Sequence, residues 1–282
     1  MSTAAASPPA FLAQSDARLV LVGAGKMGMA MLEGWLALGL PARQVAVVEP
    51  NPSPGIAALA QRGVLLNPPA GTVGKATAIV IAVKPQVAPQ VMPDLAPLID
   101  ARTVVVSIMA GRTLDFLQRL LPAETALVRA MPNTPAAIGR GITVAVPNGR
   151  VAESQRDLTH RLLKATGAVE WIDDETLMDA VTAVSGSGPA YVFLLADSLA
   201  RAGVAAGLPP DLAARLARAT VAGSGELLRL SPLPASTLRE NVTSPGGTTA
   251  AALAVLMGEH GFDPILKQAV AAAARRSREL AG

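Results

Sequence analysis

The residues best suited to chemistry lie in a glycine bend late in the sequence, at positions 242–249 (VTSPGGTT), just before a small-residue helix predicted from Ala250. A Pro-Gly-Gly turn that leads hydroxyl residues into a helix leaves several backbone N–H groups unpaired beside the positive end of the helix dipole. Such helix starts bind anions. We therefore predict a carboxylate site here, with the hydroxyl groups of Ser244, Thr248 and Thr249 beside it.

A second glycine bend, Gly-x-Gly-x-x-Gly at positions 23–28, lies between the apolar run Arg18–Val22 and a helical pattern from Met27 to Leu38. In this strand–turn–helix context the motif predicts dinucleotide binding. The first glycine permits a tight turn, the second lets the backbone approach the pyrophosphate, and the third allows close helix–strand packing. The alternative is a glycine turn without a ligand. The predicted cofactor-binding residues of the bend are Gly23, Ala24, Gly25, Lys26, Met27 and Gly28.

An acidic residue follows this motif at the spacing that a dinucleotide site requires. Glu49 ends the second predicted strand, Gln44–Glu49. A carboxylate at this place hydrogen-bonds the 2′-hydroxyl of the adenosine ribose and repels a 2′-phosphate. The alternative is an exposed carboxylate at a strand end. With no Arg directly after it, Glu49 favours the use of NADH.

Two further segments end predicted strands, where the ligands of open α/β sheets lie. In the segment 82–85 (AVKP), Lys84 either orients a cofactor or substrate or is a solvated charge. The segment 107–111 (SIMAG) either lines a nicotinamide with small and apolar groups or is a plain strand-to-helix turn.

The elements that must position these residues belong to two kinds. Short runs that are apolar almost throughout predict strands at Arg18–Val22, Gln44–Glu49, Ala78–Val83, Thr103–Ile108, Ala126–Ala130 and Ile142–Val146. Such strands belong to a sheet that is covered on both faces. The predicted fold class is therefore α/β, a Rossmann-type doubly wound parallel sheet. After Trp171 the strand-like runs end, and periodic apolar residues predict helices at Pro189–Gly203, Pro210–Leu230 and Asp263–Leu280.

This change of pattern predicts the domain organisation. We expect a flexible tail over residues 1–17, a dinucleotide-binding domain over 18–171 and a helical domain over 172–282. Aromatic residues make up only 2% of the sequence, so the helical region has little with which to fill a core of its own. Its small-residue faces permit close approach of other helices. We expect it to form a homodimer and to carry the substrate site.

Composition excludes several classes of function. The 282 residues are 51% hydrophobic and 16% charged, with a formal net charge of +3, no Cys and two His. Disulfides, thiolate metal sites and thiol catalysis are therefore excluded, and no metal site is predicted. The basic run Arg275–Arg278 lies in the last turns of a helix, where cations complement the dipole, so no nucleic-acid partner is predicted. No signal sequence or membrane-spanning run is recognised, and we expect a cytoplasmic protein.

Two other segments combine proline with small residues. Prolines at both ends of the run Pro132–Pro135 fix the backbone, which predicts an ordered loop over Met131–Pro135. The segment Ser185–Tyr191 opens a predicted helix with small residues that let another surface come close. Either segment can be purely structural.

Taken together, these motifs resemble those of the pyrroline-5-carboxylate reductases. The matching pieces are the bend at 23–28, AVKP at 82–85, MPNTP at 131–135, SGSGPAY at 185–191 and, above all, VTSPGGTT at 242–249. They occur in the family's order and span nearly the whole chain from Arg18. The resemblance implies NADPH or NADH as cofactor, 1-pyrroline-5-carboxylate as substrate and L-proline as product.

The resemblance also implies roles for individual residues. The stretch Ser244–Thr249 would hold the substrate carboxylate, and the hydroxyl of Thr249, the expected catalytic residue, would face the ring nitrogen. The expected substrate-binding residues are Val242, Ser244, Gly246, Gly247 and Thr248. The further residues expected to line the cofactor are Ala82, Val83, Lys84, Pro85, Ile108, Met109 and Ala110. Helical domains would interlock in a homodimer whose active sites are shared between protomers, and rings of dimers are a further possibility.

The sequence departs from the family in three places. The tail 1–17 lies outside the match, the segment 231–234 (SPLP) has no acid where some relatives have Glu, and Glu49 favours NADH in a family that more often uses NADPH. Two alternatives stay open. One is a related imine or β-hydroxyacid reductase, although such hydroxyacid enzymes commonly use a Lys that the segment Tyr191–Arg201 lacks. The other is a non-catalytic dinucleotide-binding sensor or scaffold.

Overall fold

The computed structural model describes residues 18–69 and 71–281, so the predicted tail at 1–17 lies outside the described residues. The chain forms two compact units. One contains the sheet, runs to Gly186 and takes in the chain again from Ala274, and the other is Ser187–Ala273. The predicted boundary at 171/172 coincides with the end of the sheet, and the short helices from 175 to 186 lie in the same compact unit as the sheet.

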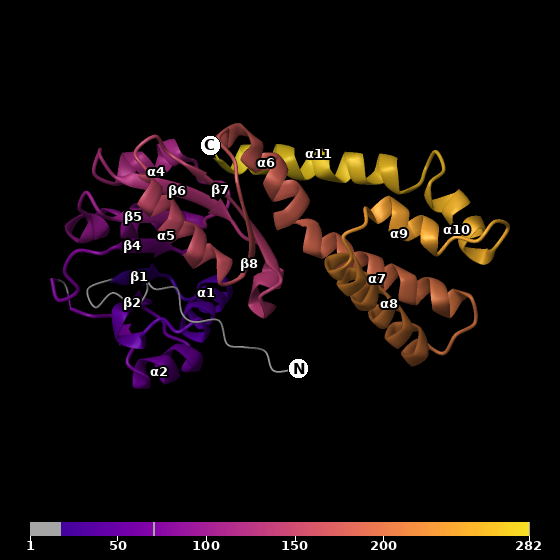
Figure 1. The fold of residues 1–282 in the computed structure, drawn as a ribbon, viewed down its shortest axis with the longest axis horizontal. Helices are drawn as coiled ribbons and strands as arrows, with labels where there is room; N and C mark the ends of the chain where they lie inside the picture. Colours follow the sequence, from indigo (N-terminus) through magenta and orange to yellow (C-terminus); the bar gives the residue numbers. More distant parts are fainter. Residues whose placement is uncertain (1–17, 70, 282) are drawn as a thin grey trace. The chain divides into compact units, whose positions relative to one another are not determined.

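The first unit is built on one eight-stranded sheet in the order β3-β2-β1-β4-β5-β6-β7-β8 (Figure 1). Its strands are β1 Leu19–Val22, β2 Val45–Val48, β3 Leu65–Leu66, β4 Ala78–Ile81, β5 Val104–Ser107, β6 Ala126–Met131, β7 Gly141–Pro147 and β8 Gly167–Trp171. The order reverses at β1, which lies between β2 and β4. This confirms the predicted Rossmann-type doubly wound sheet.

One pair departs from the parallel arrangement. Strands β6 and β7 are antiparallel, and all other neighbours are parallel. Between them lies only the short 3₁₀ helix η4 (Thr134–Ile138), and a parallel connection needs a crossover of a dozen or more residues. The sequence did not predict β3, which has two residues, or β8, whose residues alternate between half-buried and exposed as on a sheet edge.

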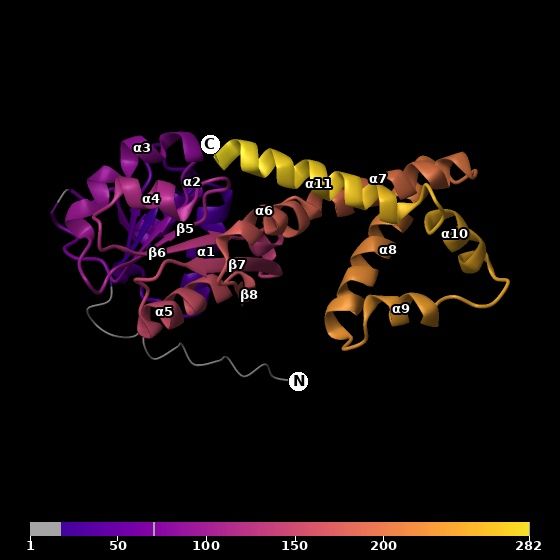
Figure 2. The same ribbon diagram turned by 90° about the horizontal axis from the view of Figure 1, so that it is seen from above.

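Helices cover both faces of the sheet. The core on one face includes residues of α1 (Lys26–Ala37), α2 (Pro54–Gln61) and α5 (Glu153–Lys164). The core on the other includes residues of α3 (Ala88–Val91), η3 (Pro93–Leu98) and α4 (Leu114–Leu120). Figure 2 shows α3 and α4 on the side of the strands opposite to α5. Strands apolar on both faces are stable only between two such layers.

The first unit also contains short helices. Of these, η1 (Ala42–Gln44) and η2 (Pro85–Val87) lie between strands. After β8 come η5 (Glu175–Leu177), α6 (Met178–Val181) and one π-helical turn at Thr182–Gly186. The last turns of α11 (Phe262–Ala281) also belong to this unit. There Ser277 donates its hydroxyl to the Oδ1 atom of Asp179 on α6, at 2.6 Å.

The second unit consists of helices. It contains α7 (Gly188–Ala205), α8 (Pro210–Leu230), α9 (Ala235–Asn241), α10 (Thr248–Leu256) and the first part of α11. Helices α7 and α8 pack closely, since a Cβ atom on Gly203 would lie 3.3 Å from the Cβ of Ala213. Among the described residues no helix is both long and apolar enough to cross a membrane.

Candidate functional site

Four predicted site segments meet along one edge of the sheet. The Gly23 N–H donates to the carbonyl of Val48 at 2.8 Å, which joins the ends of β1 and β2. The Ala82 N–H donates to Val22 at 2.7 Å and the Ile108 N–H to Ile81 at 3.0 Å, which adds the ends of β4 and β5. This edge holds the carboxyl ends of the strands at the point where the strand order reverses, which is where open α/β sheets bind their ligands.

The first glycine bend has the shape that a diphosphate requires. Gly23 has a φ of +92°, and a Cβ atom there would lie 2.8 Å from the carbonyl of Ala82. A Cβ atom on Gly28 would lie 2.4 Å from the carbonyl oxygen of Gly23. Gly25 differs, because the space beside it is open. It begins α1 without a side-chain cap, so the N–H groups of the first turn are available to an anion.

Glu49 holds the glycine bend in place. One of its carboxylate oxygens accepts the Ala24 N–H at 2.8 Å, and the other accepts the Asn51 N–H at 3.0 Å. The Glu49 backbone is held in turn by the side chain of Asn67, which accepts the Glu49 N–H and donates to the Glu49 carbonyl, both at 2.8 Å. Asn67 was not predicted from the sequence. Its φ of +45° is the only positive value among the described non-glycine residues.

The residues after β4 and β5 differ in what they present to this edge. Lys84 and Ala110 are exposed, whereas Val83, Pro85 and Ile108 are half-buried. The side chain of Met109 is buried in the core beneath the sheet, and its N–H donates to Ser107 Oγ at 3.3 Å. Met109 therefore supports the loop from below, and only its backbone is placed to face a ligand.

The second glycine bend lies wholly in the helical unit. After α9, the Thr243 N–H donates to Glu240 and the Gly247 N–H to Ser244, which forms a turn. Gly246 has a φ of +69°, and Gly247 begins α10 without a side-chain cap. The first main-chain bond of the helix runs from the Ala251 N–H to the carbonyl of Gly247 at 3.2 Å.

The N–H groups of Thr248, Thr249 and Ala250 precede that bond and are the donors that an incoming anion would find. Ser244 and Thr248 are exposed, and Thr249 is half-buried. The structure thus has the geometry of an anion site at the predicted place.

Met131 and Gly186, one residue of each proline-containing segment, meet within the sheet unit. A Cβ atom on Gly186, in the π-helical turn, would lie 2.5 Å from the terminal methyl of Met131. Asn133 orders the following loop by accepting the Ile142 N–H at 2.9 Å. Both segments are therefore tightly ordered, and π-helical turns occur frequently at functional sites.

A largely buried ion pair lies near them and was not predicted. The Arg129 guanidinium on β6 donates to Glu175 Oε1 at 2.7 Å, and this oxygen also accepts the Leu114 N–H at 2.9 Å. The side chains of Arg129 and Glu175 are 5% and 27% exposed. The pair connects β6, the start of α4 and η5, whose positions in the sequence are too far apart for a local pattern to reveal it.

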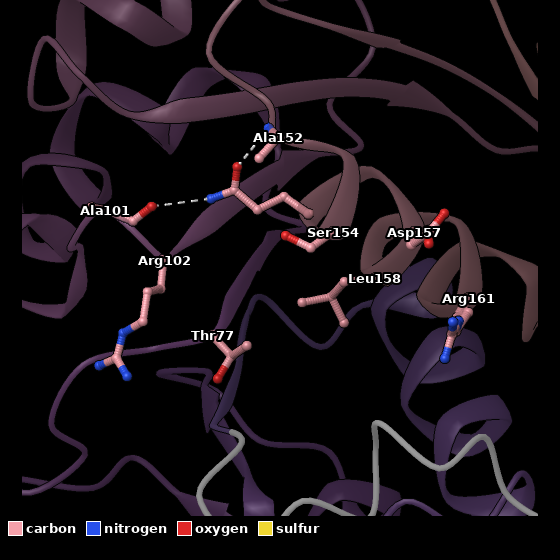
Figure 3. A pocket seen from close by; sticks show the side chains of 9 residues that line it. Thr77, Ala101, Arg102, Ala152, Ser154, Asp157, Leu158 and Arg161 are labelled. Carbon is pink, nitrogen blue, oxygen red and sulfur yellow. Dashed lines mark hydrogen bonds between the residues drawn. The ribbon is translucent and has the colours of Figure 1, made fainter.

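Concave regions occur both beside these segments and away from them. One of about 530 Å³ has Val48, Pro50 and Asn67 in its lining and therefore lies next to Glu49. A cavity of about 450 Å³ is lined by residues such as Thr77, Arg102 and Ser154 (Figure 3). Thr77 and Arg102 precede β4 and β5, so this cavity is at the opposite, amino-terminal edge of the sheet. Its Gln155 side chain accepts the Ala152 N–H and donates to the Ala101 carbonyl. Over the described part of the chain, His, Asp and Glu side chains form no group that could hold a metal ion.

Comparisons with known proteins agree with this geometry. Residues 175–280 match the family model described as pyrroline-5-carboxylate reductase dimerisation, and residues 18–111 match that of NADP oxidoreductase coenzyme F420-dependent. A pyrroline-5-carboxylate reductase of Pseudomonas aeruginosa is 37% identical over 95% of this chain and 98% of its own length. The chain belongs to the pyrroline-5-carboxylate reductase family. This confirms the resemblance found in the sequence. It also confirms the predictions that the protein is an NAD(P)-dependent oxidoreductase and that its helical region serves dimerisation.

Solved structures of the pyrroline-5-carboxylate reductase family have the same fold. That of Coxiella burnetii has a TM-score of 0.88 at 29% identity and covers 95% of this chain and 100% of its own. A Plasmodium falciparum pyrroline carboxylate reductase, solved with NADP bound, has a TM-score of 0.79 at 29% identity and covers 94% and 98% of the two chains. The fit of the first glycine bend to a dinucleotide agrees with that ligand.

Proposed function

We propose that this protein reduces 1-pyrroline-5-carboxylate to L-proline with NADPH or NADH, the final step of proline biosynthesis. The observation that carries the proposal is the second glycine bend, where Gly247 begins α10 without a side-chain cap and hydroxyl residues follow at once. Membership in the family supports the reaction. The open glycine bend at the carboxyl edge of the sheet supports the cofactor.

The reaction forms one C–H bond and one N–H bond. A bound NADPH or NADH supplies a hydride to the imine carbon and leaves as the oxidised nucleotide, and a proton from water completes the amine. A protonated imine is already electrophilic, so the protein needs no strongly acidic side chain. Holding the imine in the correct orientation then provides most of the rate.

The carboxylate of the substrate provides the handle for this orientation. In our proposal it accepts hydrogen bonds from the backbone N–H groups of Thr248 and Thr249 and from the Ser244 hydroxyl. The turn at Gly246 directs these donors to one side, and Val242 borders the site. The N-terminal end of the α10 dipole adds favourable electrostatics for a negative charge.

Thr249 has the catalytic role in this proposal. It is the second residue of α10, so a carboxylate held by the bend brings the ring nitrogen close to its hydroxyl. A hydroxyl both donates and accepts, and can therefore bind the nitrogen before and after protonation and relay the proton from water.

The cofactor residues complete the proposed site. Backbone groups of the bend at 23–28 would hold the diphosphate, with Lys26 beside it. Lys84 and the backbone around Ile108 and Ala110 would border the nicotinamide. These groups bind and orient, and none of them takes part in bond making.

We propose a homodimer as the working form, with each active site shared between protomers. In the helical unit the only buried apolar side chains described are Ala213 and Ala217, whereas Phe193 and Val255 are 67% and 75% exposed. Helices with so much exposed apolar surface are stable when a partner covers them. A ring of dimers and a cytoplasmic location are further parts of the proposal, to be tested by light scattering and by cell fractionation.

The test of the reaction combines purified protein, 1-pyrroline-5-carboxylate and each reduced nucleotide. We expect oxidation of the nucleotide and formation of L-proline in equal amounts. Omission of the imine gives the background rate. Binding of the nucleotide without proline formation would refute the reaction and favour a sensor or scaffold, and oxidation with another cyclic imine or a keto acid only would favour a related reductase.

A further inference from the structure

We infer that Glu49 and Asn67 together make this protein select NADH over NADPH, with Glu49 as the specificity residue and Asn67 as its positioning residue. The inference rests on the proposed nicotinamide-dependent function and adds the choice between two nucleotides that differ only in a 2′-phosphate. It comes from contacts at the end of β2.

Two hydrogen bonds fix the direction of the Glu49 carboxylate. Glu49 is half-buried and accepts one backbone N–H on each oxygen, from Ala24 and from Asn51. Each oxygen has a second lone pair free to accept a ribose hydroxyl. Because Ala24 belongs to the glycine bend, the carboxylate lies beside the site of the diphosphate, where the adenosine ribose must follow.

The surroundings of Glu49 are unfavourable for a 2′-phosphate. Its negative charge would lie next to the carboxylate in a partly buried place, where repulsion is weakly screened. The Asn51 N–H, a backbone donor that could otherwise bind a phosphate, is already taken by Glu49. Both features act against NADPH and leave NADH unaffected.

The positively charged side chains near the end of β2 are few. The segment 50–61, which follows Glu49, has no Lys or Arg. Lys84 follows β4, which lies two strands from β2, a separation of roughly 10 Å at the usual strand spacing. Lys26 is in the glycine bend beside the diphosphate. The segment 50–61 thus provides no positive side chain to accept a 2′-phosphate.

Asn67 positions Glu49 through its hydrogen bonds. Its side chain pairs with both the N–H and the carbonyl of Glu49, at 2.8 Å each, and its own N–H donates to Val47, also at 2.8 Å. Its φ of +45° is a conformation that Asn adopts more readily than most residues. Asn67 therefore fixes the backbone of Glu49 from the side of β3, across β2 from the glycine bend, and determines where the carboxylate points.

The test measures binding of NADH and of NADPH to the full-length protein by calorimetry, with no imine present. We expect the dissociation constant of NADPH to exceed that of NADH by about tenfold or more, as expected for a like charge at short range. Tighter binding of NADPH would overturn the inference and leave the proposed function intact. Binding of neither nucleotide would overturn both.

Two variants assign the selectivity to the residues. Glu49→Gln is expected to bring the two dissociation constants within about threefold of each other, because the charge is gone. Asn67→Gly keeps the positive φ and the bond to Val47 while it removes both side-chain bonds to Glu49. It is expected to raise the KM for NADH several-fold at unchanged kcat and to reduce the selectivity.

The matched control is Glu33→Gln, which removes an exposed carboxylate from α1 and is expected to leave the selectivity unchanged. A cooperative thermal unfolding transition shows that Asn67→Gly is folded. If Glu49→Gln and Asn67→Gly both retained the parental ratio of dissociation constants, the assignment to these residues would be wrong. A change of ratio in Glu33→Gln would equally refute it, since net charge alone would then be the cause.

Discussion

The two glycine bends are similar in form but lie in different surroundings. In the sheet unit, Gly23 and Gly28 are forced by contact, since a Cβ atom on either would lie within 3 Å of backbone. In the helical unit, the space beside Gly246 is open and most of the bend is exposed. Both bends begin a helix, α1 or α10, without a side-chain cap. By contrast, Ser53 and Thr113 cap α2 and α4 with their hydroxyl groups.

This difference bears on which of the two proposed sites is complete within one chain. The first glycine bend is held by β2, β4 and Glu49, so its shape is determined by its own unit. The second glycine bend has hydrogen bonds with its own neighbours, such as the bond from Gly247 to Ser244. Local hydrogen bonds determine the shape of such a bend. The other residues that surround the substrate then have to come from another part of the assembly, and in our proposal they belong to the partner subunit.

The largest effect is expected for Gly28→Ala. The added Cβ atom would overlap the carbonyl oxygen of Gly23 at 2.4 Å, so the bend has to move. We expect nucleotide affinity to fall by about a hundredfold, the cost of displacing a binding group by roughly 1 Å. Calorimetry with NADH measures it, and Gly149→Ala, where the space beside the residue is also open and which lies outside the bend, serves as the comparison for an added Cβ atom.

The next effect is expected for Thr249→Ala. Loss of the hydroxyl is expected to lower kcat by about tenfold or more while NADH affinity stays unchanged, because a positioned proton-transfer group is removed. Steady-state rates with saturating nucleotide measure the change. Thr249→Ser keeps a hydroxyl and should recover most of the rate. Full activity in a correctly folded Thr249→Ala protein would remove this residue from the mechanism.

A smaller effect is expected for Gly246→Ala. No atom is in the way, so the cost comes only from a side chain at a φ of +69°, about 1–2 kcal/mol. We expect a higher KM for the imine and unchanged binding of NADH. Chemical denaturation and initial rates test this, and a loss of NADH binding would show that the two bends are not independent.

The smallest effect is expected for Thr113→Ala, which removes the cap of α4. The Thr113 hydroxyl accepts the Phe116 N–H at 3.1 Å, and loss of such a cap costs about 1 kcal/mol of unfolding free energy. Since this cap serves structure alone, kcat/KM should stay within twofold of the parent value. A drop in kcat/KM larger than the drop in stability explains would contradict the distinction between capped and uncapped helices.

The sequence predicted what local chemistry determines. The spacing of the glycines predicted both bends, because a tight turn and the uncapped start of a helix each depend on only a few neighbouring residues. Apolar runs predicted β1, β2, β4, β5, β6 and β7, because strands buried on both faces carry almost no polar residue. The substrate and cofactor roles of individual residues stay predictions.

What escaped prediction depends on distant partners. Asn67 acts on Glu49, 18 residues away, and Arg129 pairs with Glu175 across 46 residues. The short β3 and the edge strand β8 gave no apolar run to recognise. The buried side chain of Met109 was expected to border the cofactor, but a residue's direction at a strand end depends on which core lies beneath it.

The last turns of α11 have a consequence for synthesis of the chain. They belong to the sheet unit, where Ser277 bonds to Asp179 and the backbone of Leu280 lies close to Gly111, just after β5. Ribosomes release the N-terminus first, and early domains commonly fold before the rest is made. Here a nascent chain that ends at Gly186 leaves Asp179 without its bond and the β5 turn uncovered. The sheet unit is thus completed only after residues 274–281 have been synthesised, and loss of these residues affects the unit whose strands are made first.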